Sequence, residues 1–162
     1  MLKKSLALIV LGFVLAGCGI IRVSNTKDQA AQIPAAGVFK SANGGELWVP
    51  KSDVYSVGGK AQKISYANIT FMKFDPQDPA TVYLGTNNGM YYSFSRGDGW
   101  FHTLNGKGGV NDLAIDPHDK CTLYAVIHDK IYKSTDCTRT WNLTHFTTVS
   151  KQSFASIHVD YS

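Results

Sequence analysis

Hydrophobic and polar positions alternate with a period of two through the middle of the chain. Met72 and Phe74 form one such run, Leu113 and Ile115 form another, and each run leads into an Asp-Pro pair. Longer runs of β-branched and aromatic residues follow, at 81–84 and 122–126. Groups of turn-forming residues come next, at 87–89 and 128–130. Short alternating runs between such turns predict β-strands joined by hairpins.

The three tryptophans mark an internal repeat. Each closes an eight-residue frame that opens with serine, and the frames are Ser41–Trp48, Ser93–Trp100 and Ser134–Trp141. The second and third copies align without a gap at an offset of 41 residues, which places Tyr83 on Tyr124. Each unit predicts four short strands, A to D, with the frame forming the turn from C to D. A period of about 41 residues with four strands is typical of a β-propeller blade.

The strand count predicts an incomplete ring. The first copy starts at strand C, and Ile157, Val159 and Asp160 align with the beginning of a further strand A. The expected fold class is therefore all-β, a partial β-propeller of about three four-stranded antiparallel blades, preceded by a signal helix and a tether. Closed propellers need about four to eight blades. We expect the open strand edges to be covered by self-association or by a larger partner, and the alternative is a small twisted body of three sheets.

The N-terminal segment has the layout of a bacterial secretion signal. Lys3 and Lys4 precede an apolar run at 5–15, which is too short to span a membrane comfortably. The run ends in Leu-Ala-Gly-Cys at 15–18, which resembles the lipobox of bacterial lipoproteins. The alternative is an ordinary secretory signal in which the cysteine has no special role.

The lipobox resemblance implies a lipid anchor. Cys18 would carry diacylglycerol on its sulfur and, after cleavage behind Gly17, an acyl chain such as palmitate on its new amino group. Two or more acyl chains anchor a protein stably where one chain does not. Gly19 after the cysteine favours the outer membrane, with the protein on its periplasmic side. The expected organisation is a signal peptide at 1–17, a lipidated tether at 18–36 and a repeat domain at 37–162.

The charge and histidine content argue against nucleic acid, metal and cofactor binding. The chain has 16 Lys and Arg against 12 Asp and Glu, a formal net charge of +4, and two of the positive charges lie in the expected signal peptide. No basic cluster occurs elsewhere, so nucleic acid is not an expected partner. The five histidines show no metal-ligand spacing, and neither a metal nor a cofactor is expected.

The repeated frame resembles the Asp-box, S-x-D-x-G-x-T-W, of BNR-like repeats in sialidase-like, sortilin-type and photosystem-assembly propellers. The resemblance covers about residues 37–160, although Thr138 stands where the box has glycine. It implies that short polar side chains bond backbone N–H groups of the turn and that each tryptophan packs in its blade. The residues given this structural role are Ser41, Asn43, Trp48, Ser93, Gly97, Trp100, Ser134, Asp136 and Trp141.

Two cysteines remain once Cys18 is assigned to the lipid. Cys121 and Cys137 flank the predicted turn at 128–130 symmetrically, so they would face each other across adjacent strands. An even pair in an oxidising compartment predicts a disulfide, and the alternative is two free thiols. Closing such a loop stabilises the fold by about 3 kcal/mol.

Candidate catalytic residues are scarce. By resemblance to sialidases, an active site would need an arginine cluster, a Tyr–Glu nucleophile pair and an aspartic acid. Arg22 lies in the tether, Arg96 and Arg139 lie inside the frames, and the single glutamate, Glu46, lies in a turn. The sequence therefore predicts that the protein is not an enzyme.

These patterns together predict an outer-membrane lipoprotein that binds proteins, as a scaffold or assembly subunit of a cell-envelope complex of secretion or conjugation type. The expected partners are the membrane, through the anchor, and a protein or a second copy of the chain. The candidate contact residues are aromatic: Tyr91, Tyr92, Phe94, Phe154 and Tyr161. One alternative is a carbohydrate or peptidoglycan binding module that uses rings such as Tyr92, Trp100 and Phe101. The other is a truncated remnant of a propeller glycosidase.

Overall fold

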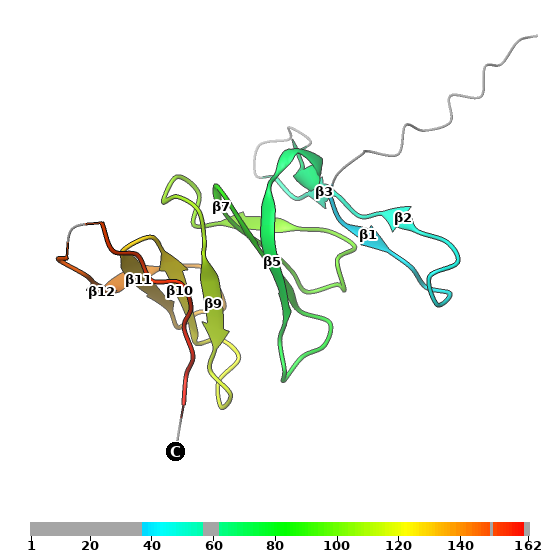
Figure 1. Cartoon of the computed structure of the whole chain (residues 1–162). Coiled ribbons are helices and arrows are strands. Elements are labelled where there is room, and N and C mark those ends of the chain that lie inside the picture. The colour runs from blue at the N-terminus through cyan, green and yellow to red at the C-terminus, as the bar shows by residue number, and fades with distance from the viewer. Residues whose placement is uncertain (1–36, 57–61, 150, 161–162) are drawn as a thin grey trace, which may run out of the picture. The chain divides into compact units, whose positions relative to one another are not determined.

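The computed structural model describes residues 37–56, 62–149 and 151–160. Tyr161 and the predicted signal peptide and tether lie outside these residues. The described chain forms four antiparallel sheets and, apart from one 3-10 turn, η1 (Ile64–Tyr66), no helix (Figure 1). The prediction of an all-β partial propeller is confirmed.

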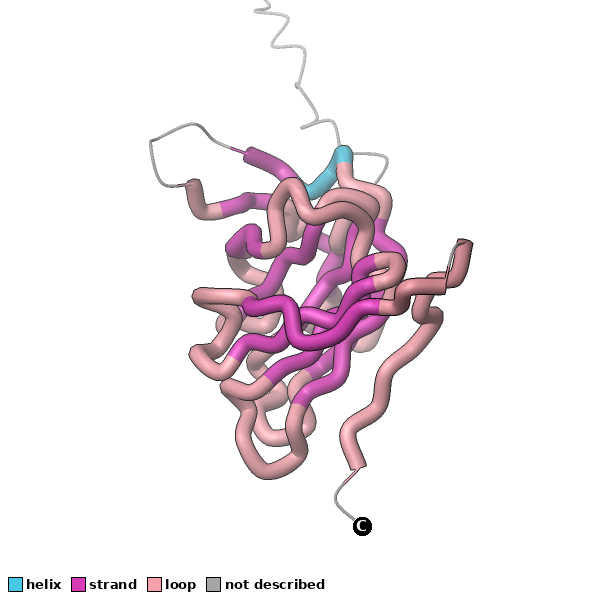
Figure 2. Tube along the Cα trace, turned by 90° about the vertical axis from the view of Figure 1, so that its left-hand side faces the viewer, coloured by secondary structure: helices cyan, strands magenta, loops and turns pink. Residues whose placement is uncertain are grey.

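The two complete repeats each form a four-stranded antiparallel sheet with its strands in chain order (Figures 1 and 2). The first of these sheets, which we name blade 2, contains β5 (Ile69–Phe74), β6 (Val82–Thr86), β7 (Gly89–Ser93) and β8 (Phe101–Thr103). The next sheet, blade 3, contains β9 (Asp112–Ile115), β10 (Leu123–Ile127), β11 (Lys130–Ser134) and β12 (Asn142–Phe146). Each predicted set of strands A to D is thus one sheet.

The first repeat forms less sheet. β1 (Phe39–Lys40) pairs with β2 (Val49–Pro50), and these strands occupy the C and D positions of that repeat. β3 (Asp53–Val54) pairs with β4 (Gln62–Lys63) in a separate two-stranded sheet. The sequence pattern did not predict this second pair, since neither segment shows an alternating run.

The described chain ends beside β9 in an extended segment, 152–160, that joins no sheet (Figure 1). The Phe154 N–H donates to the His128 carbonyl oxygen over 2.8 Å, and the Ile157 N–H donates to the Asp112 carboxylate over 3.0 Å. Because a side-chain acceptor takes the place of a strand carbonyl, the further strand A expected at Ile157 does not form.

Two apolar clusters hold the sheets together. The first lies between blades 2 and 3, where Tyr83 and Met90 cluster with Leu113, Leu123 and Ala125. The second joins blade 2 to the first repeat and contains Val38, Val54, Ile64, Val82, Leu84 and Trp100. β6 is buried along its whole length because alternate side chains enter the two clusters.

A tryptophan from each complete repeat reaches onto the repeat before it. The Trp100 indole N–H donates to the Lys51 carbonyl oxygen over 2.8 Å, and the Trp141 indole N–H donates to Thr103 Oγ1 over 2.9 Å. Each acceptor residue stands three positions after the tryptophan of the preceding frame. Trp100 is 1% exposed, whereas Trp48, the first of the three, is 55% exposed. The tryptophans therefore join successive repeats instead of packing only within their own.

The turn of each frame is built on its serine. Ser41, Ser93 and Ser134 each accept, on Oγ, a hydrogen bond from the backbone N–H four residues on, over 2.8, 3.0 and 3.0 Å. That N–H belongs to Gly97 in the second frame and to Thr138 in the third, with φ of 81° and 73°. Glycine adopts this left-handed conformation freely, but threonine does so only under restraint.

A second polar side chain completes two of the frames. Asp136 accepts hydrogen bonds from Ser134 Oγ over 2.9 Å, from the Thr140 N–H over 2.9 Å and from Thr140 Oγ1 over 2.6 Å. In the first frame the Asn43 side-chain oxygen accepts from the Leu47 N–H over 2.9 Å. The turn N–H groups are therefore satisfied by side chains of the frame itself.

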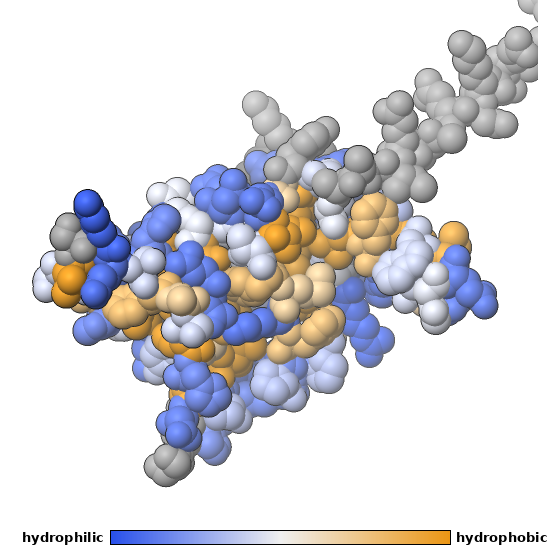
Figure 3. Space-filling model, viewed as in Figure 1, coloured by the Kyte–Doolittle hydropathy of each residue, from blue (hydrophilic) through white to orange (hydrophobic). Residues whose placement is uncertain are grey.

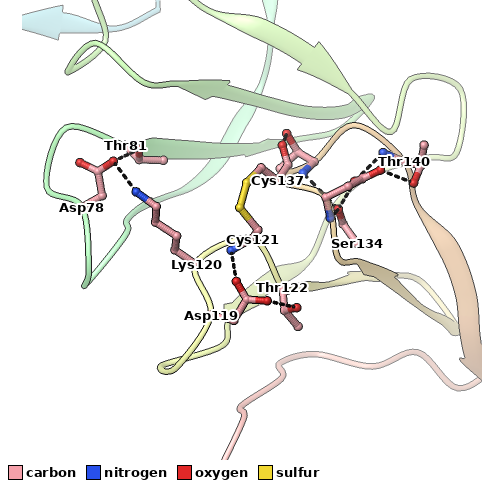
Figure 4. Close-up of a disulfide and its surroundings, with 11 residues drawn as sticks. Asp78, Thr81, Asp119, Lys120, Cys121, Thr122, Ser134, Cys137 and Thr140 are labelled. Atoms are coloured by element: carbon pink, nitrogen blue, oxygen red, sulfur yellow. Dashed lines mark hydrogen bonds and ion pairs between the residues drawn. A yellow bond between two sulfur atoms is a disulfide. The ribbon is translucent and has the colours of Figure 1, made fainter.

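The predicted disulfide between Cys121 and Cys137 is present and ties β10 to the third frame (Figure 4). The Cys137 N–H also donates to the Cys121 carbonyl oxygen over 3.1 Å. Asp119 fixes the turn before Cys121, because its carboxylate accepts from the Cys121 N–H over 3.0 Å and from Thr122 Oγ1 over 2.8 Å. The crosslink therefore restrains the turn in which Thr138 holds a positive φ.

Replacing Trp100 by alanine is expected to lower the free energy of unfolding by about 3–5 kcal/mol, because the change leaves a cavity between blade 2 and the first repeat. Trp48→Ala is the matched control and is expected to cost less than about 1 kcal/mol, since its ring is already half in water. Urea denaturation of the two variants measures the difference. Equal losses would contradict the role given to Trp100.

Candidate interaction surfaces

Four aromatic rings form one continuous cluster on the β7–β8 side of blade 2. We name Tyr55, Tyr92, Phe94 and Phe101 the aromatic patch. The Phe101 ring centroid lies 4.8 Å from that of Tyr55, 5.3 Å from that of Tyr92 and 6.3 Å from that of Phe94. Tyr55 is 58% exposed and Phe94 is 50% exposed, so the patch presents apolar surface to solvent.

Strand register and one glycine place these rings together. Tyr92 of β7 and Phe101 of β8 are cross-strand partners, and Phe94 follows Tyr92 by two positions on the same face. Tyr55 comes from the chain just after β3, and its ring lies against Gly99. A Cβ at Gly99 would overlap that ring, so the glycine in the second frame is what allows Tyr55 to reach the patch.

The structure separates the five aromatic residues that the sequence marked as partner contacts. Tyr92 and Phe94 lie together in the patch. Tyr91 emerges on the opposite face of the same strand, because neighbouring strand residues alternate. Phe154 lies in the segment beside β9, and Tyr161 lies outside the described residues.

The sequence pattern does not mark two members of the patch as protein contacts. The sequence marked Phe101 only as a possible carbohydrate-binding ring. Its position opposite Tyr92 could have been inferred from the hairpin register. Tyr55 has no such local cue, because its place depends on how the first repeat folds onto the second frame. Trp100, the other ring considered for carbohydrate, is buried between the repeats and closed to a ligand.

A cleft of about 500 Å³ lies between the β1–β2 hairpin and the β5 side of blade 2. Its walls include Trp48, Met72 and Phe74, which are 55%, 48% and 59% exposed. Figure 3 shows apolar surface over β5 and toward the hairpin. The cleft is open because β9 stands beside one side of β5, while the described part of the first repeat supplies only strands C and D on the other.

Charged groups tie the β1–β2 hairpin to the second frame. The ammonium nitrogens of Lys40 and Lys51 lie 3.1 and 2.8 Å from the Asp98 carboxylate. Hydrogen bonds from Lys51 and then Lys40 lower the pKa of Asp98 below its usual value, so the carboxylate keeps its charge at neutral pH. The pairing adds an electrostatic link beside the Trp100 hydrogen bond.

A further ion pair joins β5 to β9. Lys73 Nζ lies 2.5 Å from Asp112 and also donates to the Leu113 carbonyl oxygen over 2.7 Å. Burial raises the pKa of Asp112, but the hydrogen bonds from Lys73 and from the Ile157 and Leu113 N–H groups outweigh burial and lower that pKa overall. The first strands of the two blades and the C-terminal segment therefore meet at one carboxylate.

Within the described ranges, no group of three or more His, Cys, Asp or Glu side chains is placed to hold a metal ion. No helix in this same part of the chain is long and apolar enough to cross a membrane.

No protein-family model matches the sequence, and no curated protein matches it significantly. The fold is similar to that of an ancestral GH74 enzyme, with a TM-score of 0.53 at 14% identity over 74% of this chain. Two further solved structures were compared. One is a GH74 xyloglucanase from Xanthomonas campestris, with a TM-score of 0.30 at 15% identity over 68% of this chain. The other is a GH74 enzyme from Niastella koreensis, with a TM-score of 0.29 at 14% identity over 66% of this chain, and both TM-scores are too low to support a comparison of folds. This chain covers 17%, 27% and 26% of these three structures.

This likeness corrects one prediction. The sequence predicts that the protein is not an enzyme, and that prediction is contradicted because the fold is similar to that of an ancestral GH74 enzyme, which points toward a glycosidase-derived fold. Glycosidases use two carboxylates held across a sugar, and such residues need not form a local motif. A glycosidase ancestry therefore does not require a local catalytic motif in these blades. At 14% identity the likeness concerns the fold and transfers no activity.

The Asp136 carboxylate provides a pH-dependent test of the third frame. Hydrogen bonds from the Thr140 side chain and N–H, and then from Ser134, lower the pKa of Asp136 from 3.8 to about 2. Because the folded-state pKa lies below the unfolded one, the stabilisation is complete above about pH 4 and is lost as the pH falls through about 2. NMR titration of the side-chain carboxyl groups should show this low midpoint, and Thr140→Val should raise it by removing the Oγ1 donor. An unchanged midpoint in that variant would contradict the hydrogen bonding described.

Proposed function

We propose that this chain is a lipid-anchored protein of the bacterial outer membrane whose glycosidase-derived propeller segment binds another protein. Its role would be that of a scaffold or assembly subunit in a cell-envelope complex of secretion or conjugation type. The aromatic patch is the observation that carries the proposal. Exposed clusters of Tyr and Phe with few charges are typical of the centres of protein interfaces.

The anchor is supported by the sequence around Cys18, where a basic start and an apolar run lead into the lipobox-like Leu-Ala-Gly-Cys.

The geometry of the patch favours a protein over a sugar. A sugar stacks on the open face of a single ring. Phe101 instead touches three other rings, and the interplanar angles within the patch range from 22° to 61°. The patch therefore offers one broad, uneven apolar surface, which suits apolar side chains of a protein partner.

Crosslinking in intact cells tests the proposal, with the captured proteins identified by mass spectrometry. The variant Tyr55→Ala/Phe94→Ala is expected to reduce capture of the partner about fivefold or more, because both rings are interface candidates. Both rings are mostly exposed, so the variant should still fold. Phe146→Ala, a ring 54% exposed on β12, is the matched control and should capture the partner normally. Cys18→Ser should release the protein from the membrane fraction, and capture that is indifferent to the double variant would refute the proposal.

A second candidate function is carbohydrate binding in the cleft beside the β1–β2 hairpin. It is favoured by the exposed Trp48 and Phe74 rings, by Lys51 and Arg96 in the cleft lining, and by the likeness to a GH74 fold. A remnant of a propeller glycosidase would retain such a cleft, and a chain covering 17% of a GH74 enzyme is compatible with that origin.

Titration calorimetry of the full chain with glucan oligosaccharides and peptidoglycan fragments tests this candidate. Binding should weaken about tenfold or more in Trp48→Ala, because aromatic stacking is lost, and should be unchanged in Phe94→Ala. Absence of binding at millimolar ligand would eliminate the candidate.

A further inference from the structure

The contact between the first repeat and blade 2 has two polar parts at defined positions of the frame. The Trp100 indole N–H bonds Lys51, which stands three residues after the preceding tryptophan. Asp98, two residues before Trp100, pairs at 3.1 Å with Lys40, which stands eight residues before that same preceding tryptophan. Blade 3 repeats the first part on Thr103, so the indole contact is a property of the repeat.

Among the described residues, the first repeat leaves one half of this contact without a partner. Trp48 and Glu46 occupy the frame positions of Trp100 and Asp98, and we name this pair the head surface. Trp48 is 55% exposed, and Glu46 is also exposed. Among the residues that the structure describes, Glu46 has no ion-pair partner within 4.0 Å. The head surface thus presents a hydrogen-bond donor on an apolar ring beside a negative charge.

The other half is unused on blade 3. Thr144 of β12 stands three residues after Trp141, and Lys133 of β11 stands eight residues before Trp141, as Lys40 does before its tryptophan. We name this pair the tail surface. Thr144 is exposed, and the Lys133 ammonium lies over the Tyr124 ring, 5.2 Å from its centroid, with no carboxylate partner in the described ranges. The tail surface thus presents an acceptor beside a positive charge.

We propose that copies of this chain associate head to tail, with the head surface of one copy on the tail surface of the next. The Trp48 indole N–H then donates to Thr144, as Trp100 does to Lys51. Glu46 pairs with Lys133, as Asp98 does with Lys40. The chain carries both halves of a contact that its own repeats already make, so a second copy is the occupant that the charges and the spacing fit.

A contact of this kind determines the assembly. Head-to-tail contacts leave one head and one tail free until a ring closes, so association beyond an isolated pair is expected, as a ring where the rotation between copies closes and as an open chain where it does not. Closure would also cover the outer faces of the first repeat and of blade 3, which otherwise expose strand edges. Neither surface includes the aromatic patch, so this inference goes beyond the proposed function. Trp48 also lines the cleft, but Glu46 and Lys133 do not, so variants of these two residues separate head-to-tail association from carbohydrate binding.

A charge exchange tests the proposal on the full chain in detergent, by analytical ultracentrifugation at low salt. Glu46→Lys puts two lysines in contact and Lys133→Glu puts two carboxylates in contact, so each variant alone should weaken association about tenfold or more. An equimolar mixture of the two variants restores opposite charges at every contact and should associate within about threefold of the wild type. Trp48→Ala should weaken association about tenfold and should not be rescued by mixing.

Two control variants and two contrary outcomes make the result decisive. Lys120→Glu changes charge by the same amount at an exposed residue with only a loose, 3.6 Å pairing to Asp78, and should associate normally. Tyr55→Ala/Phe94→Ala should also associate normally, which separates this test from that of the patch. A wild-type chain that stays monomeric at high concentration, or two charge variants that fail to rescue each other, would overturn the proposal.

Discussion

Two indole N–H groups in the described part of the chain, those of Trp100 and Trp141, find their acceptor on the preceding repeat. Trp100 meets the Lys51 carbonyl and Trp141 meets Thr103 Oγ1 at equivalent positions. Burying such a large ring contributes several kcal/mol, but leaving its N–H unpaired would cost about 1–3 kcal/mol. The hydrogen bond therefore fixes where one sheet can sit on the next.

The polar residues of each frame fix the turn that precedes its tryptophan. Its serine caps the turn, a carboxylate or amide takes up further N–H groups in two of the three copies, and the third copy adds the Cys121–Cys137 disulfide. The third frame shows why several restraints are combined, since Thr138 must hold a left-handed conformation that glycine would adopt without strain. Where the turn is rigid, the tryptophan leaves the sheet in one direction and the inter-repeat contact is reproducible.

The candidate surfaces occur where the repeat departs from its own pattern. Gly99 in the second frame makes room for Tyr55 and so creates the aromatic patch. The described part of the first repeat provides strands C and D beside β5, which leaves the cleft with Met72 and Phe74 on its wall. The regular parts of the chain thus account for a propeller-type fold similar to that of a GH74 enzyme, and the irregular parts form the surfaces proposed for binding.

The strands of blades 2 and 3 and the disulfide between Cys121 and Cys137 could be predicted from the sequence alone. These features are local or recur at a constant offset, so periodicity and spacing are enough to predict them. Only the tertiary structure decided that the tryptophans reach across to the preceding repeat, that Tyr55 joins Phe101, and that the segment at Ile157 stays outside any sheet. Those outcomes depend on contacts between residues far apart in the chain. A local pattern of hydrophobic and polar positions does not contain the energies of such contacts.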